Sequence, residues 1–182
     1  MVEQKELKTY FQRIEMYYAD FDTKKLREHG TLVHDTEKGI FGVSDLKVIF
    51  EFFKKIGLSD TDVFVDLGSG DGRVVLVASL FSKAIGIEYD QELIAESAEA
   101  VKAMASEAEF YAKDYEAFDY SQATVLFSYA DHPFTPTFIE KLKTEFNGLL
   151  YVYQGVFLPE GVLKGRTVWI GQTPLISYDF SG

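Results

Sequence analysis

The stretch "VDLGSGDGRVV", residues 65–75, has glycines at positions 68, 70 and 72, directly after an aspartate and a short apolar run. Because glycine has no side chain, Gly68 and Gly70 allow a ligand to approach the backbone and can adopt positive φ. Gly72 permits tight packing where a helix begins. A glycine-rich turn can also join a strand to a helix with no ligand present. The surrounding residues must therefore distinguish a ligand-binding turn from a purely structural one.

Two phosphate-binding patterns do not fit this turn. A dinucleotide fingerprint needs a small residue where the chain has Arg73, and the Gly-Lys-Ser/Thr of a P-loop is missing. Carboxylates are present instead: Asp66 precedes the glycines, and Glu88 lies twenty residues after Gly68. At that interval a carboxylate can accept hydrogen bonds from both hydroxyls of an adenosine ribose. The alternative for Glu88 is an ordinary surface residue.

The elements that must position these residues alternate between strand and helix, which is typical of a parallel sheet covered on both faces. Apolar runs predict strands at 63–67, 83–88, 109–112, 124–129 and 149–157, and an antiparallel hairpin at 167–180 with its turn at 171–174. Helices are predicted at 73–82, after a cap at Asp90, and from Thr135 and Pro136 to Asn147-Gly148. We therefore predict an α/β fold, doubly wound and Rossmann-like. Its mostly parallel seven-strand sheet ends in the C-terminal hairpin.

A helical N-terminal extension is predicted for the first forty residues. An apolar stripe at spacings of three and four indicates an amphipathic helix over 3–27, formed by Leu7, Phe11, Ile14, Tyr18 and Phe21. We expect the stripe to pack on the same domain; a dimer seam or a flap over a substrate are the alternatives. A loop is expected over 29–42, followed by a helix that Ser44 caps and Gly57 ends.

The pattern D-x-G-x-G-x-G, with Glu88 at the end of the next strand, resembles motif I and its partner in class I S-adenosylmethionine-dependent methyltransferases. The resemblance implies that S-adenosyl-L-methionine is the cofactor and that residues 43–182 form the methyltransferase domain, with 1–42 as the extension. It implies that Asp66, Gly68 and Gly70 hold the methionine end, Glu88 the ribose and Tyr89 the adenine. Asp114 would accept from the adenine amine with Tyr115 beside it. The complete implied cofactor set is Asp66, Gly68, Ser69, Gly70, Glu88, Tyr89, Asp114, Tyr115 and Ser128.

The segment "SYADHPF", residues 128–134, follows the fourth strand, where such enzymes carry the residues that face the reaction centre. Asp131 can orient or deprotonate an amine, and Tyr129 or Phe134 can form the wall of a narrow channel. We take Asp131 and Tyr129 as the candidate catalytic residues. The alternative is a polar loop ahead of a helix. For His132, which could also carry a proton away, we favour that alternative.

Two resemblances suggest different methyl acceptors. "DHPF" is similar to the Asp-Pro-Pro-Tyr/Phe tetrapeptide of enzymes that methylate adenine, cytosine or glutamine, with His132 in place of the first proline. Over residues 42–157 the chain resembles the seven-strand protein-lysine methyltransferases, including the cofactor domain of non-SET histone-lysine enzymes. The segments that carry this second resemblance are "FVDLGSGDGRVVLVAS", "AIGIEYDQELI" and "ATVLFSYADHPFTPTFIEKLKTEF".

A protein lysine is the leading acceptor. The lysine ammonium, with a pKa of about 10.4, must lose a proton before it attacks. Aromatic walls, for which Tyr115, Tyr129, Phe134 and Phe41 are candidates, would lower that pKa by desolvation. A small-molecule methyltransferase and a non-catalytic S-adenosylmethionine-binding interaction protein are the alternatives.

Charge and composition limit the partners. The net charge of −11 disfavours long nucleic acids and favours a basic protein or a small cationic molecule. The chain lacks cysteine, and its histidines at 29, 34 and 132 are not paired at i,i+4, so we expect no metal site. No apolar run reaches the roughly 18 residues of a membrane span, and the charged stretch 1–8 does not resemble a secretory signal. We expect a cytoplasmic protein, either a monomer or a homodimer.

Overall fold

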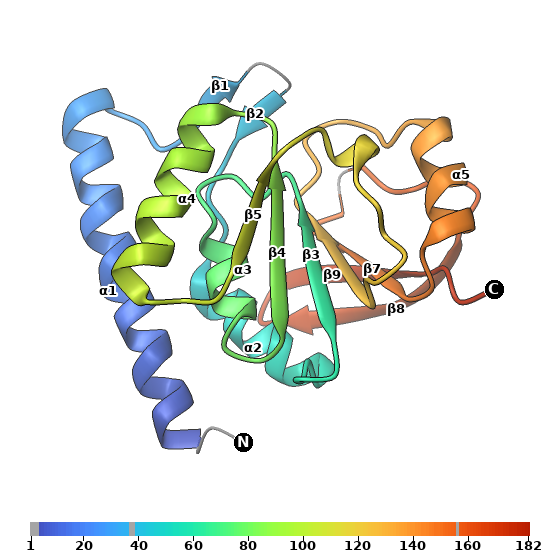
Figure 1. Ribbon diagram of the computed structural model, residues 1–182, viewed down its shortest axis with the longest axis horizontal. Coiled ribbons are helices and arrows are strands. Elements are labelled where there is room, and N and C mark those ends of the chain that lie inside the picture. Colours follow the sequence, from blue (N-terminus) through green and yellow to red (C-terminus); the bar gives the residue numbers. More distant parts are fainter. Residues whose placement is uncertain (1–3, 37–38, 156) are drawn as a thin grey trace.

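The computed structural model describes residues 4–36, 39–155 and 157–182. A seven-stranded sheet lies at its centre, with the strand order β5-β4-β3-β6-β7-β9-β8 (Figure 1). The strands are β3 (Val63–Leu67), β4 (Lys83–Glu88), β5 (Glu109–Ala112), β6 (Val125–Ser128), β7 (Leu149–Tyr153), β8 (Leu163–Ile170) and β9 (Thr173–Asp179). Strands β3 to β7 pair in parallel, whereas β9 pairs antiparallel with both β7 and β8. The predicted fold class is confirmed.

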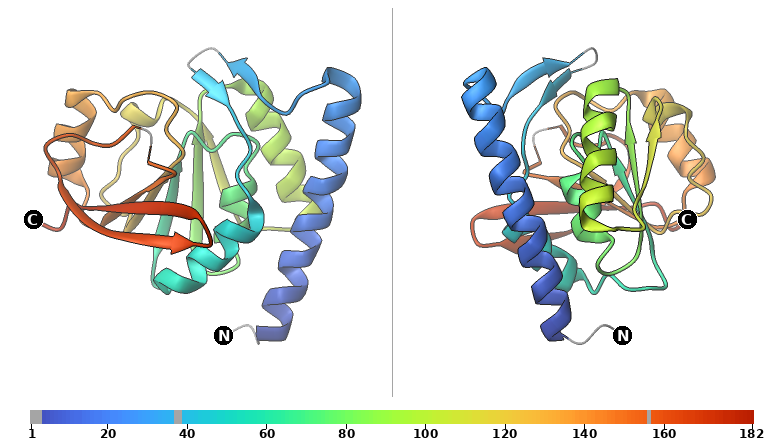
Figure 2. Two further views of the ribbon diagram at one scale, coloured as in Figure 1. Left: turned by 180° about the vertical axis from the view of Figure 1, so that it is seen from behind. Right: turned by 60° about the vertical axis from the view of Figure 1, so that its left-hand side comes forward.

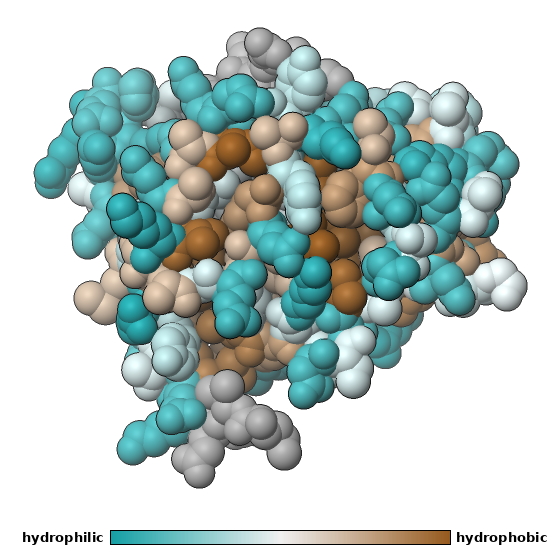
Figure 3. Space-filling view, viewed as in Figure 1, coloured by the Kyte–Doolittle hydropathy of each residue, from teal (hydrophilic) through white to brown (hydrophobic). Residues whose placement is uncertain are grey.

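Helices cover both faces of this sheet. Along each strand the side chains alternate between the faces, so that Phe64 and Phe127 belong to one core and Val65 and Leu126 to the other. The first core contains residues of α2 (Leu46–Ile56), α3 (Arg73–Ala78) and α4 (Gln91–Met104), and of α1 (Gln4–His29), which contacts α3 and α4. The second core contains residues of α5 (Pro136–Glu145) and of the segment around the short helix η1 (Tyr115–Ala117). Figure 3 shows hydrophilic residues around the periphery of one side of the molecule and apolar residues toward its middle.

Helix α1 packs on its own domain, as predicted. Phe11, Ile14 and Tyr18 are buried in the first core, and α1 contacts α3 and α4. Figures 1 and 2 show the helix running along one side of the molecule, next to α4. The apolar stripe is therefore covered by the chain itself. None of the described helices is both long and apolar enough to cross a membrane.

Several local expectations were wrong. The loop expected at 29–42 contains a hairpin of two short antiparallel strands, β1 (His34–Thr36) and β2 (Gly39–Phe41). Asp45, not Ser44, caps α2, because the Asp45 carboxylate accepts from two backbone N–H groups of the first turn. Helix α3 ends at Ala78 and not at residue 82. Beyond Ala78 the N–H groups of Leu80 and Phe81 donate to carbonyl oxygens three residues earlier, which is the spacing of a turn and not of an α-helix.

Strand β7 is also shorter than expected. It ends at Tyr153 and not at residue 157, because Gln154 and Gly155 adopt positive φ of 57° and 65°, which a strand cannot contain. The loop that follows leads to β8, and the β8–β9 pair forms the predicted hairpin. Strand β3 lies between β4 and β6 at the centre of the sheet, so the strand order reverses there. In such sheets, ligands bind outside the carboxyl ends of the strands at that position.

Candidate active site

A cavity of about 630 Å³ opens at the carboxyl ends of β3, β4 and β6. Its volume lies in the ordinary range for small-molecule and cofactor sites. All eleven site residues predicted from the sequence line it: Asp66, Gly68, Ser69, Gly70, Glu88, Tyr89, Asp114, Tyr115, Ser128, Tyr129 and Asp131. The cavity has two contrasting sides, the glycine turn (residues 68–72) and the β6 loop (residues 129–135).

The backbone of the glycine turn is fixed against β4. The N–H groups of Gly68 and Ser69 both donate to the Ile87 carbonyl oxygen, at 3.0 Å each. Gly68 and Gly70 have positive φ of 76° and 55°, as the sequence predicts. A Cβ at Gly68 would meet no atom within 4 Å. Gly68 therefore offers room for a ligand to approach the backbone.

Gly72 has a packing role. It adopts a φ of 83°, and a Cβ added there would lie 2.7 Å from Phe110 Cζ and 2.8 Å from Ser97 Cβ. These contacts are shorter than any that a Cβ normally makes, so only glycine fits. The expectation that Gly72 permits tight packing at the start of the helix is confirmed.

Glu88 holds the turn together from the end of β4. Its Oε2 accepts from the Gly70 N–H at 2.9 Å, and its Oε1 accepts from the N–H groups of Tyr89 at 2.7 Å and Asp90 at 2.9 Å. Each carboxylate oxygen has two lone pairs, so these bonds occupy Oε1 and leave one lone pair on Oε2. Glu88 therefore fixes the backbone around the cavity and keeps one acceptor position for a ligand.

Asp66 is a buried carboxylate, with only 3% of its surface exposed. Burial, and then the negative charges of Glu88 and Asp71, raise the pKa of Asp66 well above its usual value. A cation in the cavity would reverse this effect by stabilising the ionised form. The site around Asp66 therefore suits a positively charged ligand group.

The Ser69 hydroxyl has no hydrogen-bond partner in the described part of the chain, and its Oγ is buried. Buried polar atoms are normally satisfied, so an orphaned hydroxyl at a cavity wall is a reason to expect a ligand there.

Tyr89, Asp114 and Tyr115 also line the cavity. Tyr89 is 42% exposed, and the Asp114 side chain accepts from the N–H of Glu116 at 3.0 Å, capping η1. Burial, followed by the charges of Glu116, Asp114 and Asp131, raises the pKa of Tyr115 to about 12. The Tyr115 phenol therefore stays protonated at neutral pH.

The β6 loop brings three polar groups together. His132 Nδ1 lies 2.5 Å from Asp131 Oδ1, and His132 Nε2 lies 3.2 Å from the Tyr115 hydroxyl. All three residues line the cavity. The sequence favoured a polar loop without a role for His132, whereas the structure places this side chain between a carboxylate and a phenol in the cavity wall.

The remaining residues of the β6 loop give the cavity an aromatic side. The Tyr129 hydroxyl donates to Gln154 Oε1 at 3.2 Å, and the Tyr129 ring packs edge-on against Tyr153. Phe134 also lines the cavity, whereas the side chain of Phe41 lies outside the described part of the structure.

Sequence reasoning missed two groups of residues in this site. Val33, Gly42 and Ser44 line the cavity, so the N-terminal segment contributes to its wall. Asp71 and Arg73 form a buried ion pair beside the turn, with 2.6 Å between Arg73 Nη2 and Asp71 Oδ2. The signal for this pair was present, because arginine stands where a dinucleotide fingerprint needs a small residue.

Comparison with solved structures shows the same fold in methyltransferases. An RNA methyltransferase from Salinibacter ruber in complex with S-adenosyl-L-homocysteine is 24% identical, with a TM-score of 0.63 over 76% of this chain and 94% of that chain. The 16S rRNA N2 G1207 methyltransferase of T. thermophilus, in complex with AdoMet and guanosine, is 15% identical, with a TM-score of 0.60 over 81% of this chain and 45% of that one. A putative methyltransferase from Escherichia coli is 19% identical, with a TM-score of 0.58 over 76% and 87% of the two chains.

No curated protein matches the sequence significantly. The model of one family, the histone methylation protein DOT1, matches residues 21–135. This match covers more than half of the chain and includes the glycine turn, Glu88 and the β6 loop. The chain therefore belongs to the DOT1 histone methylation family, and it is a class I S-adenosylmethionine-dependent methyltransferase.

Proposed function

We propose that this enzyme methylates an amine and that the acceptor is a protein lysine side chain. The observation that carries the proposal is the β6 loop, where Asp131 and His132 lie beside the aromatic side chains of Tyr115, Tyr129 and Phe134 in one cavity wall. A lysine has an apolar stem and a cationic end, and an aromatic channel with a carboxylate complements both parts.

The cofactor, in this proposal, lies against the glycine turn. S-adenosylmethionine supplies an electrophilic methyl group on a positively charged sulfur. The raised pKa of Asp66 and the orphaned hydroxyl of Ser69 support a ligand with an ammonium group at this end of the cavity. Glu88, with one free acceptor position, is proposed to bind a ribose hydroxyl, and Tyr89 and Asp114 to contact the adenine.

The residues of the β6 loop would prepare the acceptor. The Asp131 carboxylate attracts the lysine ammonium, and the aromatic side chains exclude water, which favours the neutral amine. His132 lies beside the Tyr115 hydroxyl and is oriented by Asp131, so it can accept the proton that the ammonium loses. Alignment of the amine with the methyl group is then the main contribution of the protein.

The net charge supports a basic partner. At −11 the chain repels the phosphates of RNA and attracts lysine-rich segments. The family match supports the same conclusion, since the family is described as a histone methylation protein. The RNA methyltransferases among the structural neighbours make RNA the competing outcome of the test.

The test uses the purified chain, methyl-labelled S-adenosylmethionine and a cell extract. We expect labelled macromolecules whose label is lost after protease treatment and kept after nuclease treatment. Mass spectrometry should then identify N-methyl-lysine. Asp131→Asn should lower this labelling, whereas the exposed Asp60→Asn should not. Nuclease-sensitive label, or label on another protein side chain, would contradict the proposal.

A further inference from the structure

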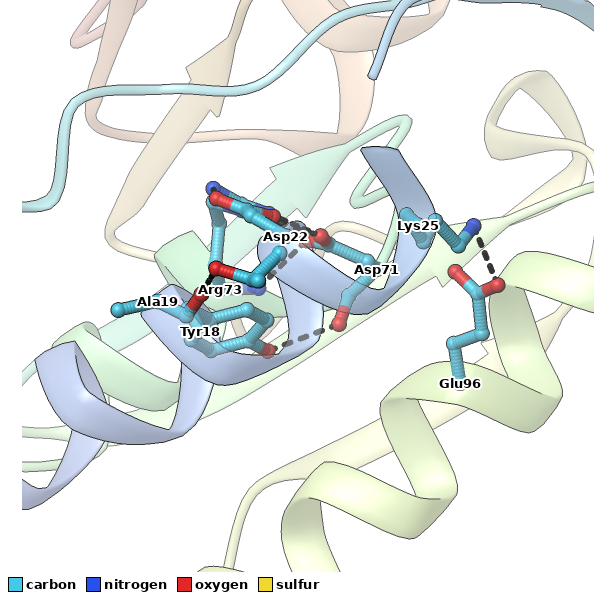
Figure 4. A network of polar contacts seen from close by, with 8 residues as sticks. Tyr18, Ala19, Asp22, Lys25, Asp71, Arg73 and Glu96 are labelled. Carbon is cyan, nitrogen blue, oxygen red and sulfur yellow. Dashed lines mark hydrogen bonds and ion pairs between the residues drawn. The ribbon is translucent and has the colours of Figure 1, made fainter. Parts of the chain in front are cut away.

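Helix α1 contacts the glycine turn from outside the cavity. Figure 2 shows α1 lying along the flank of the molecule, and in Figure 4 the side chains of Tyr18 and Asp22 reach from it toward Asp71 and Arg73. Asp71 lies between two glycines of the turn, and Arg73 begins α3. The contact therefore joins the N-terminal helix to the segment proposed to bind the cofactor.

Asp71 is held at both its backbone and its side chain. The Tyr18 hydroxyl donates to the Asp71 carbonyl oxygen at 2.9 Å. The Arg73 guanidinium donates to the Asp71 carboxylate through Nη2 at 2.6 Å and through Nε at 3.0 Å. Tyr18 and Asp71 are each 1% exposed, so water does not compete for these bonds.

Asp22 completes the network from α1. Its Oδ1 accepts from Arg73 Nη2 at 2.7 Å, and its Oδ2 from Nη1 at 3.2 Å. The guanidinium also lies over the Tyr18 ring, 4.7 Å from its centroid. Burial lowers the pKa of Arg73, but the carboxylates of Asp71 and Asp22 outweigh burial and raise this pKa above its usual value, so the guanidinium stays charged.

A turn with three glycines needs such support. Glycine has the largest backbone freedom of any residue, and a loose turn would lose entropy each time it bound a ligand. The positions of Gly70 and Gly72 depend on Asp71, which lies between them. A fixed Asp71 keeps the Gly70 N–H directed at Glu88 and the Gly68 backbone open to the cavity.

We propose that α1 is a positioning element of the cofactor site: Tyr18 and Asp22, acting through Asp71 and Arg73, pre-organise the glycine turn, so cofactor affinity depends on them. The inference concerns cofactor binding alone and is independent of which acceptor the enzyme methylates.

The main test is calorimetric titration of S-adenosylhomocysteine into the full-length chain. Asp22→Asn keeps the shape of the side chain but removes the negative charge that faces Arg73, and it should raise Kd by about tenfold. Tyr18→Phe removes one hydrogen bond and should raise Kd by about threefold. Asp22→Glu should recover most of the affinity. Circular dichroism at the titration temperature verifies that each variant is folded.

The matched control is another ion pair of α1. Lys25 Nζ lies 2.5 Å from Glu96 Oε1 of α4, and the two side chains are 16% and 21% exposed. In Figure 4 this ion pair is separate from the contacts that Asp71 and Arg73 make with α1. Lys25→Met should lower the melting temperature and leave Kd within about twofold of the wild type. If Lys25→Met weakens binding as much as Asp22→Asn, general docking of α1 is sufficient and the proposal is overturned.

Hydrogen exchange provides a second readout that needs no cofactor. In Asp22→Asn and Tyr18→Phe, the amides of residues 68–72 should exchange faster than in the wild type, while those of β6 should not change. Unchanged exchange in the turn, or unchanged Kd in both variants, would overturn the proposal. Failure of the wild type to bind S-adenosylhomocysteine would overturn it as well.

Discussion

The two sides of the cavity are built differently. The glycine turn and Asp66 form the buried side: Asp66, Ser69 and Asp71 are at most 5% exposed, and backbone hydrogen bonds join the turn to β4. The β6 loop lies at the surface, where Tyr129 is 38% exposed and the His132 side chain 47%. Its polar residues are positioned by side-chain contacts with other segments.

This difference fits two tasks. A buried, pre-organised side can bind one invariant ligand at low entropic cost, whereas a surface loop can vary to suit different acceptors. We therefore expect substitutions in the turn to affect cofactor affinity and substitutions in the β6 loop to affect turnover.

The largest effect is expected at Glu88. Glu88→Ala removes three bonds to backbone N–H groups as well as the proposed ribose contact. Cofactor affinity should fall by roughly 3 kcal/mol, more than a hundredfold. Calorimetry against the exposed control Glu107→Ala measures this loss. Equal affinities in folded proteins would show that Glu88 has no part in the site.

A smaller effect is expected in the β6 loop. Asp131→Asn should reduce kcat by about a hundredfold, the low end for a positioned acid–base group, and leave cofactor Kd within about twofold. Single-turnover kinetics together with calorimetry separate the two quantities. A change in Kd without a change in kcat would remove the distinction between the two sides of the cavity.

Substitution of Asp66 should have opposite effects on cofactor binding and on the stability of the fold. The folded-state pKa lies above the unfolded value of about 3.9, so the folded protein loses stability as the pH rises through the interval between the two. Asp66→Asn removes this cost. At pH 7 it should raise the melting temperature by about 2–4 °C for each kcal/mol gained, and weaken cofactor binding by about tenfold.

Calorimetry and thermal melts at several pH values test this prediction. The stability gain of Asp66→Asn should shrink as the pH falls, and it should vanish below about pH 3, where the wild-type carboxyl is protonated in both the folded and the unfolded state. A variant that is less stable than the wild type at pH 7 would contradict a raised pKa at Asp66.

The smallest effect is expected from salt. Attraction between the acidic enzyme and a lysine-rich substrate is screened as ionic strength rises, because the Debye length falls to about 8 Å at 0.15 M. KM for a basic protein substrate should increase several-fold between low and physiological salt, and cofactor Kd should change less. Salt-independent KM would argue for a neutral acceptor.

The sequence predicted the cofactor side better than the acceptor side. Short-range patterns encode the turn: glycine at 68, 70 and 72, and a carboxylate at the end of each of two neighbouring strands. The contact between His132 and Tyr115 joins residues seventeen positions apart, and no local sequence pattern predicts it. The same holds for Arg73 and Asp22, which are fifty-one positions apart and meet only because α1 packs beside α3.

The errors at element boundaries have a similar origin. Composition favours helix beyond Ala78 and strand beyond Tyr153, but local hydrogen bonds and positive φ end both elements early. The β1–β2 hairpin was missed because each strand has only three residues, too few for a periodic signal.

The central claim is that the cavity beside the glycine turn binds the cofactor. A crystal structure of the complex with S-adenosylhomocysteine tests it most directly. The account predicts the ribose at Glu88, the amino group near Asp66 and the sulfur facing the β6 loop. A ligand located anywhere else on the chain would contradict it.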